Sequence, residues 1–264
     1  MLIAQISDTH ILAPDSDHPA ADTRAENLER CVADINRQQP DAVVFTGDTV
    51  QHGQAEEYAR LRALLAPLEA PLYLIPGNRD DNETLRAAFN DLAYLPAEGD
   101  FLHYTVEMPA LRLVALDSTA VGERKGVFCA ARQAWLEETL GGAPERPTVL
   151  LIHHPPFDID DHYIGGYRRP EEAEALAAIV SRHPQVVRLI CGHVHCPTER
   201  RWAGTVATTM PSVAVDVRKS VDESVARERP IYLLHRLTDD SGLVSQLRTV
   251  AETAESLQDV AAAQ

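Results

Sequence analysis

The chain has 264 residues, of which 45% are hydrophobic, so it is long enough to bury a substantial core. Its 40 acidic side chains outnumber the 24 basic ones, and the formal net charge of −16 argues against a nucleic acid polymer or an anionic membrane as a partner. No run reaches the roughly 18–20 consecutive apolar residues of a transmembrane helix, and the N-terminal MLIAQISDTH lacks the basic start of a signal peptide. The four cysteines form no tight framework, so we expect free thiols and a cytoplasmic location.

The first part of the chain alternates short apolar runs with amphipathic segments. The runs LIAQI, AVVFT and LYLI predict buried strands at residues 2–6, 42–46 and 72–75. Residues 24–38 and 54–66 carry apolar side chains at helical spacing without an internal proline or glycine, which predicts two helices. Continuous apolar strands joined by helices favour parallel pairing, with the helices covering the sheet.

The second part of the chain continues this pattern and then changes. Further strands are predicted at 111–116, 148–152 and 186–190, and further helices at 130–139 and 171–182. The stretches 202–215 and 230–236 are typical of hairpin strands, and 154–170 predicts a long loop of the kind that is often functional. We expect one domain over residues 1–250 and a tail at 251–264 that forms a surface helix or is flexible.

Five of the apolar runs end abruptly in Asp, Asn or His. Ligands of open α/β sheets bind beyond the carboxyl ends of the strands, so these ends are expected at one edge of the molecule. Side chains at i and i+2 of an extended stretch point the same way, which would let such pairs converge. Neighbouring glycines predict tight turns or a close approach of the backbone to a bound group. The polar residues at these ends are Asp8, His10, Asp48, Asn78, His153, His193 and His195.

Seven nitrogen and oxygen ligands are too many for one zinc ion, which usually takes four. They suit two divalent cations that share a bridging carboxylate, as in phosphatases and nucleases. Mixed imidazole and carboxylate ligation fits Mn, Fe or Zn without choosing among them. Each residue also has a simpler interpretation, because Asp and Asn form caps and turns and a lone histidine is commonly structural.

In their order along the chain, these motifs match a known family. The set Asp8-x-His10, Gly47-Asp48, Gly77-Asn78-Arg79-Asp80, His153 and Gly192-His193-Val194-His195 resembles the calcineurin-like metallophosphoesterase superfamily. The resemblance runs from Met1 to about Asp216, and the chain length and the phrase TTMPSVAV further resemble the bacterial cyclic-nucleotide phosphodiesterase and glycerophosphodiesterase branch. It implies a four-layer α/β/β/α sandwich of two mixed sheets flanked by helices.

The resemblance also implies how the site works. The ligands form two sets bridged by Asp48, with Asp8, His10 and His195 on one ion and Asn78, His153 and His193 on the other. A hydroxide on or between the metals would attack phosphorus in line, without a covalent enzyme intermediate. Relatives in this branch often form dimers, so a homodimer or a higher homo-oligomer is a candidate state.

Arg79 departs from the family motif, which has His between Asn and Asp or Glu. That His contacts the phosphate and protonates the leaving group, whereas Arg stays protonated and cannot do the second job. Arg79 can clamp phosphate oxygens and stabilise developing charge, so we assign it, with Asn78, to substrate binding, and Arg79 also to catalysis. Asp80 is assigned a catalytic role as an outer partner that orients a ligating or substrate-facing group, or else it caps the helix expected at 82–89.

Two hypotheses cover protonation of the leaving group. Either water or another residue supplies the proton, with His154, His162 and Tyr163 as candidates and His154 also as a substrate contact, or the substrate has a leaving group that needs little acid help. His52 and Arg24 are interpreted as solvated loop residues, with a place at the border of the pocket as the alternative.

The leading interpretation is a phosphodiesterase that acts on small diesters, such as a cyclic nucleotide or a glycerophosphodiester. It rests on chain length and overall sequence style, without an identified base or glycerol pocket. The alternative is a phosphomonoesterase or nucleotidase with the same metal centre, and a nuclease is disfavoured because no basic stripe is present. A remote alternative is a non-catalytic scaffold of the same fold, which would be expected to lack metal ligands.

Overall fold

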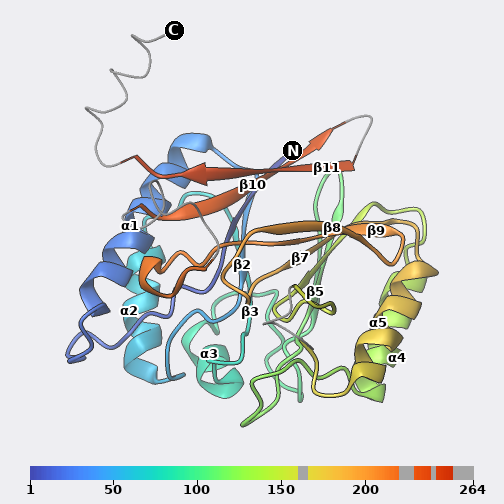
Figure 1. Cartoon of the computed structure of the whole chain (residues 1–264), viewed down its shortest axis with the longest axis horizontal. Coiled ribbons are helices and arrows are strands. Elements are labelled where there is room, and N and C mark those ends of the chain that lie inside the picture. Colours follow the sequence, from blue (N-terminus) through green and yellow to red (C-terminus); the bar gives the residue numbers. More distant parts are fainter. Residues whose placement is uncertain (160–165, 220–228, 239–241, 252–264) are drawn as a thin grey trace, which may run out of the picture.

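The computed structural model describes residues 1–159, 166–219, 229–238 and 242–251. Two mixed sheets lie between helices in these residues, so the chain has the expected α/β architecture (Figure 1). Of the predicted tail, residues 252–264 lie outside the described residues, as do His162 and Tyr163 of the predicted loop. Within the described part, no helix is long and apolar enough to cross a membrane.

Helices and strands alternate through most of the described chain. The helices are α1 (Ala21–Gln38), α2 (Ala55–Leu65), α3 (Asn82–Ala88), α4 (Ala130–Gly141), α5 (Pro170–Ser181) and the short 3-10 helix η1 (Val215–Val217). The strands are β1 (Leu2–Ile6), β2 (Ala42–Thr46), β3 (Leu72–Ile75), β4 (Tyr104–Glu107), β5 (Arg112–Leu116), β6 (Thr148–Ile152), β7 (Val186–Cys191), β8 (Thr198–Trp202), β9 (Thr205–Thr209), β10 (Ile231–Thr238) and β11 (Gly242–Thr249).

Each sheet combines parallel strands with antiparallel ones, at one edge of the first sheet and at both edges of the second. The first has the order β11-β10-β1-β2-β3, in which β1, β2 and β3 are parallel and β10 runs antiparallel to β1. The second has the order β4-β5-β6-β7-β9-β8, in which β5, β6, β7 and β9 are parallel and the two outermost strands are antiparallel. Parallel neighbours place their carboxyl ends together, which positions the polar residues that follow them.

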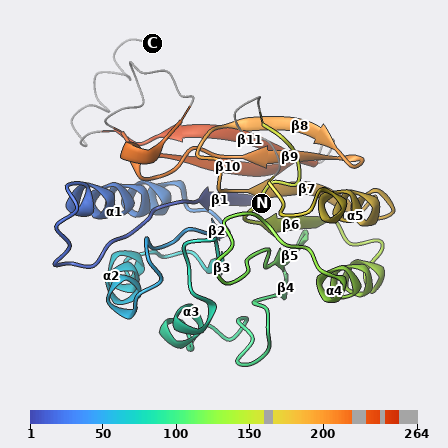
Figure 2. The same cartoon turned by 60° about the horizontal axis from the view of Figure 1, so that its bottom comes forward.

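Alternate side chains of β5 show how the sheets pack. Leu113 and Ala115 belong to the large core that β1, β2 and β3 share with α1 and α2, whereas Val114 and Leu116 belong to the core under α4 and α5. Successive strand residues point to opposite faces, so one face of this sheet meets the other sheet and the second face meets helices. Figure 2 shows α1, α2 and α3 on one side of the sheets and α4 and α5 on the other. The result is the four-layer sandwich.

The inner strands and the helices were predicted to within about three residues, but several outer strands were not. The hairpin strand expected within 202–215 is confirmed as β9, which pairs with β8, but the strand is shorter than expected because residues 210–214 are irregular. Strands β4 and β11 carried no clear signal. Three of these strands, β4, β8 and β11, lie at sheet edges, where one side faces solvent and continuous apolar sequence is not required.

Candidate metal centre

The predicted ligands follow strands of both sheets and meet where these strands end. In the described residues, two groups of His and Asp side chains have ligand atoms within 4.8 Å of one another. They are Asp8, His10, Asp48 and His195 in the first group, and His153, His154 and His193 in the second. Six of the seven predicted ligands therefore come together in groups that can hold a metal ion. The seventh, Asn78, follows β3.

Asp48 lies between the two groups. One carboxylate oxygen, Oδ2, is 3.8 Å from His10 Nε2, and the other, Oδ1, is 3.5 Å from His153 Nε2. Within the first group, His195 Nε2 lies 3.2 Å from both Asp8 Oδ1 and His10 Nε2. A carboxylate with one oxygen toward each group has the placement that a bridging ligand requires.

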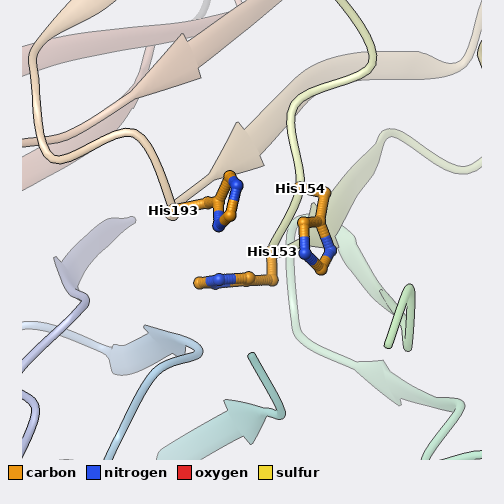
Figure 3. Close-up of side chains that lie close together, drawn as sticks. All are labelled: His153, His154 and His193. Carbon is orange, nitrogen blue, oxygen red and sulfur yellow. The ribbon is translucent and has the colours of Figure 1, made fainter. Parts of the chain in front are cut away.

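The second group gathers three imidazole rings (Figure 3). The ring centroid of His154 is 4.5 Å from that of His193 and 4.8 Å from that of His153. His153 Nε2, His154 Nε2 and Asn78 Oδ1 are buried and have no hydrogen-bond partner in the part of the chain that the structure describes. A buried polar atom without a partner costs about 1–3 kcal/mol. These atoms therefore fit a metal ion, which would satisfy them.

The sequence assigns His154 to substrate binding or proton donation. It does not predict that His154 lies in the second ligand group. Its ring is buried, with Nδ1 2.8 Å from Ser118 Oγ. Burial, followed by the nearby His153 ring, holds the pKa of His154 well below its usual range. A neutral imidazole keeps one N–H and is a very weak acid, so burial of this ring disfavours His154 as the proton donor. The doublet His153-His154 directly after β6 was the available sequence signal.

Backbone strain concentrates on the predicted ligands. Five of the seven non-glycine residues with positive φ in the described chain are ligands: Asp8 (54°), His10 (47°), Asp48 (47°), His193 (71°) and His195 (59°). The left-handed region is unfavourable for such residues and persists where the surrounding structure enforces it, commonly at functional sites. The prediction that these pairs converge because the chain is extended is therefore wrong. They converge through tight left-handed turns instead.

Two glycines allow the ligand loops to touch. A Cβ added at Gly77 would collide with the backbone nitrogen and a carboxylate oxygen of Asp48. At Gly192 it would collide with the Ser7 hydroxyl and lie 2.6 Å from the Thr46 carbonyl oxygen. A close approach of the backbone was predicted here, to a bound group. The structure shows a close approach to the neighbouring ligand loops instead.

Backbone carbonyls orient two of the histidines. His153 Nδ1 donates to the Thr46 carbonyl oxygen at 2.7 Å, and His195 Nδ1 donates to the Val217 carbonyl oxygen at 2.9 Å. Each bond fixes the proton on Nδ1 and leaves the Nε2 lone pair for a metal, the usual arrangement of outer partners around a ligating His. A carbonyl oxygen leaves no mark in the sequence, so Val217 could not have been predicted.

The electrostatics of the site favour the metal-binding forms of Asp8, His10 and His193, whereas the pKa values of Asp48 and His195 are raised. Burial lowers the pKa of His10 to about 3, and desolvation holds the pKa of His193 well below its usual range, so both rings are neutral. Burial raises the pKa of Asp8, but the hydrogen bond to His195 and the attraction to His195, His153 and His10 together outweigh burial, and the net pKa is lowered. Burial raises the pKa of Asp48, and repulsion from Asp8 raises it further. Attraction to His153 lowers it only in part, so the net pKa is raised. A cation between these carboxylates would relieve that repulsion.

Asp80 braces the two loops that carry Asp48 and Asn78. It accepts hydrogen bonds from the backbone nitrogen of Gly77 at 2.8 Å, from that of Thr49 at 3.1 Å and from the Tyr58 hydroxyl at 3.0 Å. Desolvation, followed by repulsion from Asp48, raises its pKa to about 6.

The alternative role of Asp80 as the cap of the next helix is wrong. Asp81 caps α3, because its carboxylate accepts from the Thr84 backbone nitrogen at 2.9 Å.

A pocket of about 600 Å³ adjoins the centre at Asn78 and Arg79. The Arg79 backbone nitrogen donates to Asp48 Oδ1 at 2.7 Å, and Arg79 lines the wall of the pocket. His52 and Phe101 contribute to the same wall. A cavity of this size suits a small organic ligand.

Known proteins resemble the chain in sequence. The family model described as calcineurin-like phosphoesterase matches residues 1–197. The chain is 32% identical over 251 residues to a protein of Arcobacter nitrofigilis named probable glycerophosphodiester phosphodiesterase GpdQ, covering 93% of this chain and 92% of that one. It is also 32% identical over 256 residues to the 3',5'-cyclic adenosine monophosphate phosphodiesterase CpdA of Pseudomonas aeruginosa, covering 95% of this chain and 90% of that one.

The fold also has a counterpart among solved structures. A dimetal phosphatase from Danio rerio superposes with a TM-score of 0.72, at 16% sequence identity, over 95% of this chain and 99% of that one. At this low identity the likeness shows the shared fold alone.

Proposed function

The chain belongs to the calcineurin-like phosphoesterase family and is therefore a phosphoester hydrolase, and on that premise we propose that it hydrolyses small phosphodiesters with two divalent metal ions. The observation that carries this proposal is the pair of adjoining ligand groups with Asp48 between them. The names of the relatives, which are glycerophosphodiester and cyclic nucleotide phosphodiesterases, support a small diester as the substrate.

The seven ligands would divide between the two ions. Asp8, His10 and His195 would hold one ion, Asn78, His153 and His193 would hold the other, and Asp48 would be shared between them. When bound, Mn, Fe or Zn ions would neutralise charge on the phosphate oxygens and activate a water as the nucleophile. Asp80 connects the two loops that carry Asn78 and Asp48, because its carboxylate accepts hydrogen bonds from the backbone nitrogens of Gly77 and Thr49.

The protein itself supplies the contacts to the rest of the substrate. Arg79 clamps a phosphate oxygen from the pocket wall, and Asn78 contacts the substrate beside the metal. The pocket of about 600 Å³ receives the two organic groups of the diester. The Arg79 guanidinium is a fixed cation where negative charge develops in the transition state. It lowers the barrier because the protein need not reorganise during the reaction.

A phosphomonoesterase or nucleotidase with the same metals is the second candidate function. The observation that favours it is Arg79, because a permanent cation at the pocket wall suits the second negative charge of a monoester.

One paired assay separates the two functions. Metal-stripped protein is reconstituted with Mn²⁺ and given bis(p-nitrophenyl) phosphate or p-nitrophenyl phosphate. Metal-dependent turnover that is faster on the diester supports the proposed function. Faster turnover of the monoester supports the phosphatase, and turnover of neither, with Mn²⁺ bound, contradicts both.

We further propose that residues 1–250 form one catalytic domain in the cytoplasm. The pairing of β10 with β1 supports the single domain, because it adds the C-terminal strands to the sheet that carries Asp8 and Asp48. Cys31, Cys129 and Cys191 are free thiols, which supports a reducing compartment. Limited proteolysis that releases a stable fragment ending well before β10 would contradict the single domain.

A homodimer or a higher homo-oligomer is proposed to form through β11. This strand is the outermost of its sheet in the described residues, and it exposes Val244 (52%) and Leu247 (44%). An edge strand with exposed apolar side chains is a ready site for pairing with another chain. Light scattering after gel filtration gives the mass in solution, and a monomer at all concentrations contradicts this proposal.

A further inference from the structure

The proposed reaction needs a proton for the leaving group, and Arg79 cannot supply it. Among the earlier candidates, His154 is buried within the second ligand group with its Nδ1 against Ser118 Oγ, and His162 and Tyr163 lie outside the described residues. We infer that His52 is the catalytic acid, which donates its Nε2 proton to the leaving oxygen of the substrate. The inference rests on the proposed phosphoester hydrolysis and assigns a residue to a step that the family motif leaves empty in this chain.

The loop that carries His52 lies against the segment that carries Arg79. The backbone nitrogens of Thr49 and Val50 donate to the carboxylate of Asp80, at 3.1 Å and 3.4 Å respectively. A Cβ built on Gly53 would lie 2.8 Å from Asp81 Cβ. The loop is therefore fixed on both sides of His52.

His52 and Arg79 line the same pocket, and so does the metal-facing residue Asn78. A group bound to the phosphorus from this side would lie within the pocket that His52 borders. The histidine thus occupies the substrate side of the centre, apart from the ligand groups.

Glu57 orients the histidine ring. Its carboxylate, only 1% exposed, accepts from the His52 backbone nitrogen at 2.8 Å and lies 2.9 Å from His52 Nδ1. A carboxylate only accepts hydrogen bonds, so Nδ1 carries a proton and Nε2 is the nitrogen left for a substrate. A buried carboxylate that holds a half-exposed histidine by Nδ1 is the arrangement by which an acid–base histidine is commonly oriented.

Solvent access lets the histidine recover its proton. The His52 side chain is 54% exposed, although its backbone and Nδ1 are held by Glu57. Several charged residues line the two pockets that His52 borders. Carboxylates outnumber cations among them: Asp15, Glu57, Asp80, Asp81, Glu83 and Asp100 against Arg79, Arg86 and Arg132.

The proton balance of the step is simple. Water oxygen forms a bond to phosphorus, and the bond from phosphorus to the leaving oxygen breaks with its electron pair on that oxygen. The leaving oxygen takes the proton from His52 Nε2 and departs as a neutral alcohol. The other proton stays on His52 Nδ1, which donates a hydrogen bond to Glu57. The proton lost by water passes to solvent, and His52 takes one from solvent before the next turnover.

The test compares substrates that differ only in how much they need an acid. Methyl aryl phosphates with leaving groups from p-nitrophenol to phenol are hydrolysed by the Mn²⁺-reconstituted chain and by His52→Gln, which keeps polarity but cannot transfer a proton. We expect kcat/KM to fall about 100-fold for the phenyl ester, since general acids contribute about 10²–10⁴-fold, and less than about 3-fold for the p-nitrophenyl ester. Glu57→Gln should likewise lower kcat/KM more for the phenyl ester than for the p-nitrophenyl ester. His18 is an exposed histidine outside the pocket, and His18→Gln should leave kcat/KM unchanged for all esters.

Each other outcome overturns the assignment. An equal loss on all esters means that His52 acts through structure or binding, and no loss on the phenyl ester means that it donates no proton. If the unaltered chain hydrolyses none of the esters with Mn²⁺ bound, the proposed function fails, and the role of His52 fails with it. If the unaltered chain hydrolyses the esters and the dependence of kcat/KM on the leaving group is the same in His52→Gln, only the role of His52 is overturned.

Discussion

We call the seven predicted metal ligands the ligand edge, and the residues that line the adjoining pocket, including His52 and Arg79, the pocket wall. The two regions meet at residues 78–79 but are built differently. Asp8, Asp48 and His153 are buried, and five of the seven ligands have left-handed backbone. His52, in contrast, is exposed, and Arg79 is half-buried on a segment between β3 and α3. On the proposed function, strained backbone would hold the metal ligands in place, whereas side chains on more exposed segments would contact the substrate. Changes in the two regions should therefore have separable effects.

The largest effect is expected for Asp48→Asn on the ligand edge. The substitution keeps the size of the side chain and the acceptor for the Arg79 backbone nitrogen, but it removes the charge that bridges the two groups. We expect Mn²⁺-dependent turnover to fall by more than about 100-fold, since changes of outer partners alone cost about 10–100-fold. Thermal unfolding of the metal-free variant should show that the fold is kept. Near-normal turnover would contradict the bridging role.

A second large effect is expected where the ligand loops touch. Gly77→Ala puts a methyl group into Asp48, and we expect it to cost about 1–3 kcal/mol of stability, as overpacking does, and to weaken Mn²⁺ binding. Gly141→Ala is the matched control, because its Cβ would meet nothing within 4 Å at the end of α4. Denaturant unfolding and Mn²⁺ titration calorimetry measure both. Equal behaviour of the two variants would contradict the close approach.

Arg79→Ala tests the pocket wall and should separate it from the ligand edge. Loss of a cation at the phosphate is expected to lower kcat/KM by about 10–100-fold, somewhat less than loss of an oxyanion-hole donor. Mn²⁺ affinity should be unchanged, because the backbone bond to Asp48 remains.

Arg86→Ala is the matched control for Arg79→Ala. The Arg86 guanidinium already binds the carbonyl oxygens of Pro96 and Gly99. A smaller loss of kcat/KM is therefore expected for this variant. A fall in metal affinity with Arg79→Ala would remove the distinction between the two regions.

The smallest effect is expected for Arg24→Ala, which acts on the ligand edge from outside. The interpretation of Arg24 as a solvated loop residue is wrong, because Arg24 is buried in α1. It donates to the His10 carbonyl oxygen at 3.0 Å and pairs with Asp216, the neighbour of Val217. Its loss should weaken Mn²⁺ affinity about 10-fold, the lower end of the range for outer partners.

Arg37→Ala is the control for Arg24→Ala on the same helix. Its exposed guanidinium pairs with Asp34, so Mn²⁺ affinity should not change. Equal Mn²⁺ affinities in the two variants would show that Arg24 does not support the ligands.

The ligand edge was predictable because its chemistry fixes residue types and their order. Asp8, Asp48 and His153 each follow a buried strand, and the sequence alone placed them beyond the carboxyl ends of those strands. The manner of convergence was not predictable, since φ at Asp8 and Asp48 depends on the packing of neighbouring loops. Left-handed Asp and His leave no pattern in a single sequence.

The pocket wall was less predictable, because it is assembled from segments far apart in the chain. Asn78 and Arg79 lie in a recognisable motif, but Phe101 comes from a loop before β4 without any motif. His52 was interpreted as a solvated loop residue, and only the fold shows that it shares a pocket with Arg79 and is held by buried Glu57. Contacts of this kind arise from tertiary packing, which local sequence does not encode.

The number of Mn²⁺ ions bound per chain tests the central claim most directly. Metal-stripped protein is titrated with Mn²⁺ in a calorimeter, and bound metal is counted by elemental analysis after removal of the excess. Two adjoining ligand groups bridged by Asp48 predict two ions per unaltered chain and fewer than two for Asp48→Asn. One ion or none in the unaltered chain, or two in the variant with undiminished affinity, would contradict the binuclear centre.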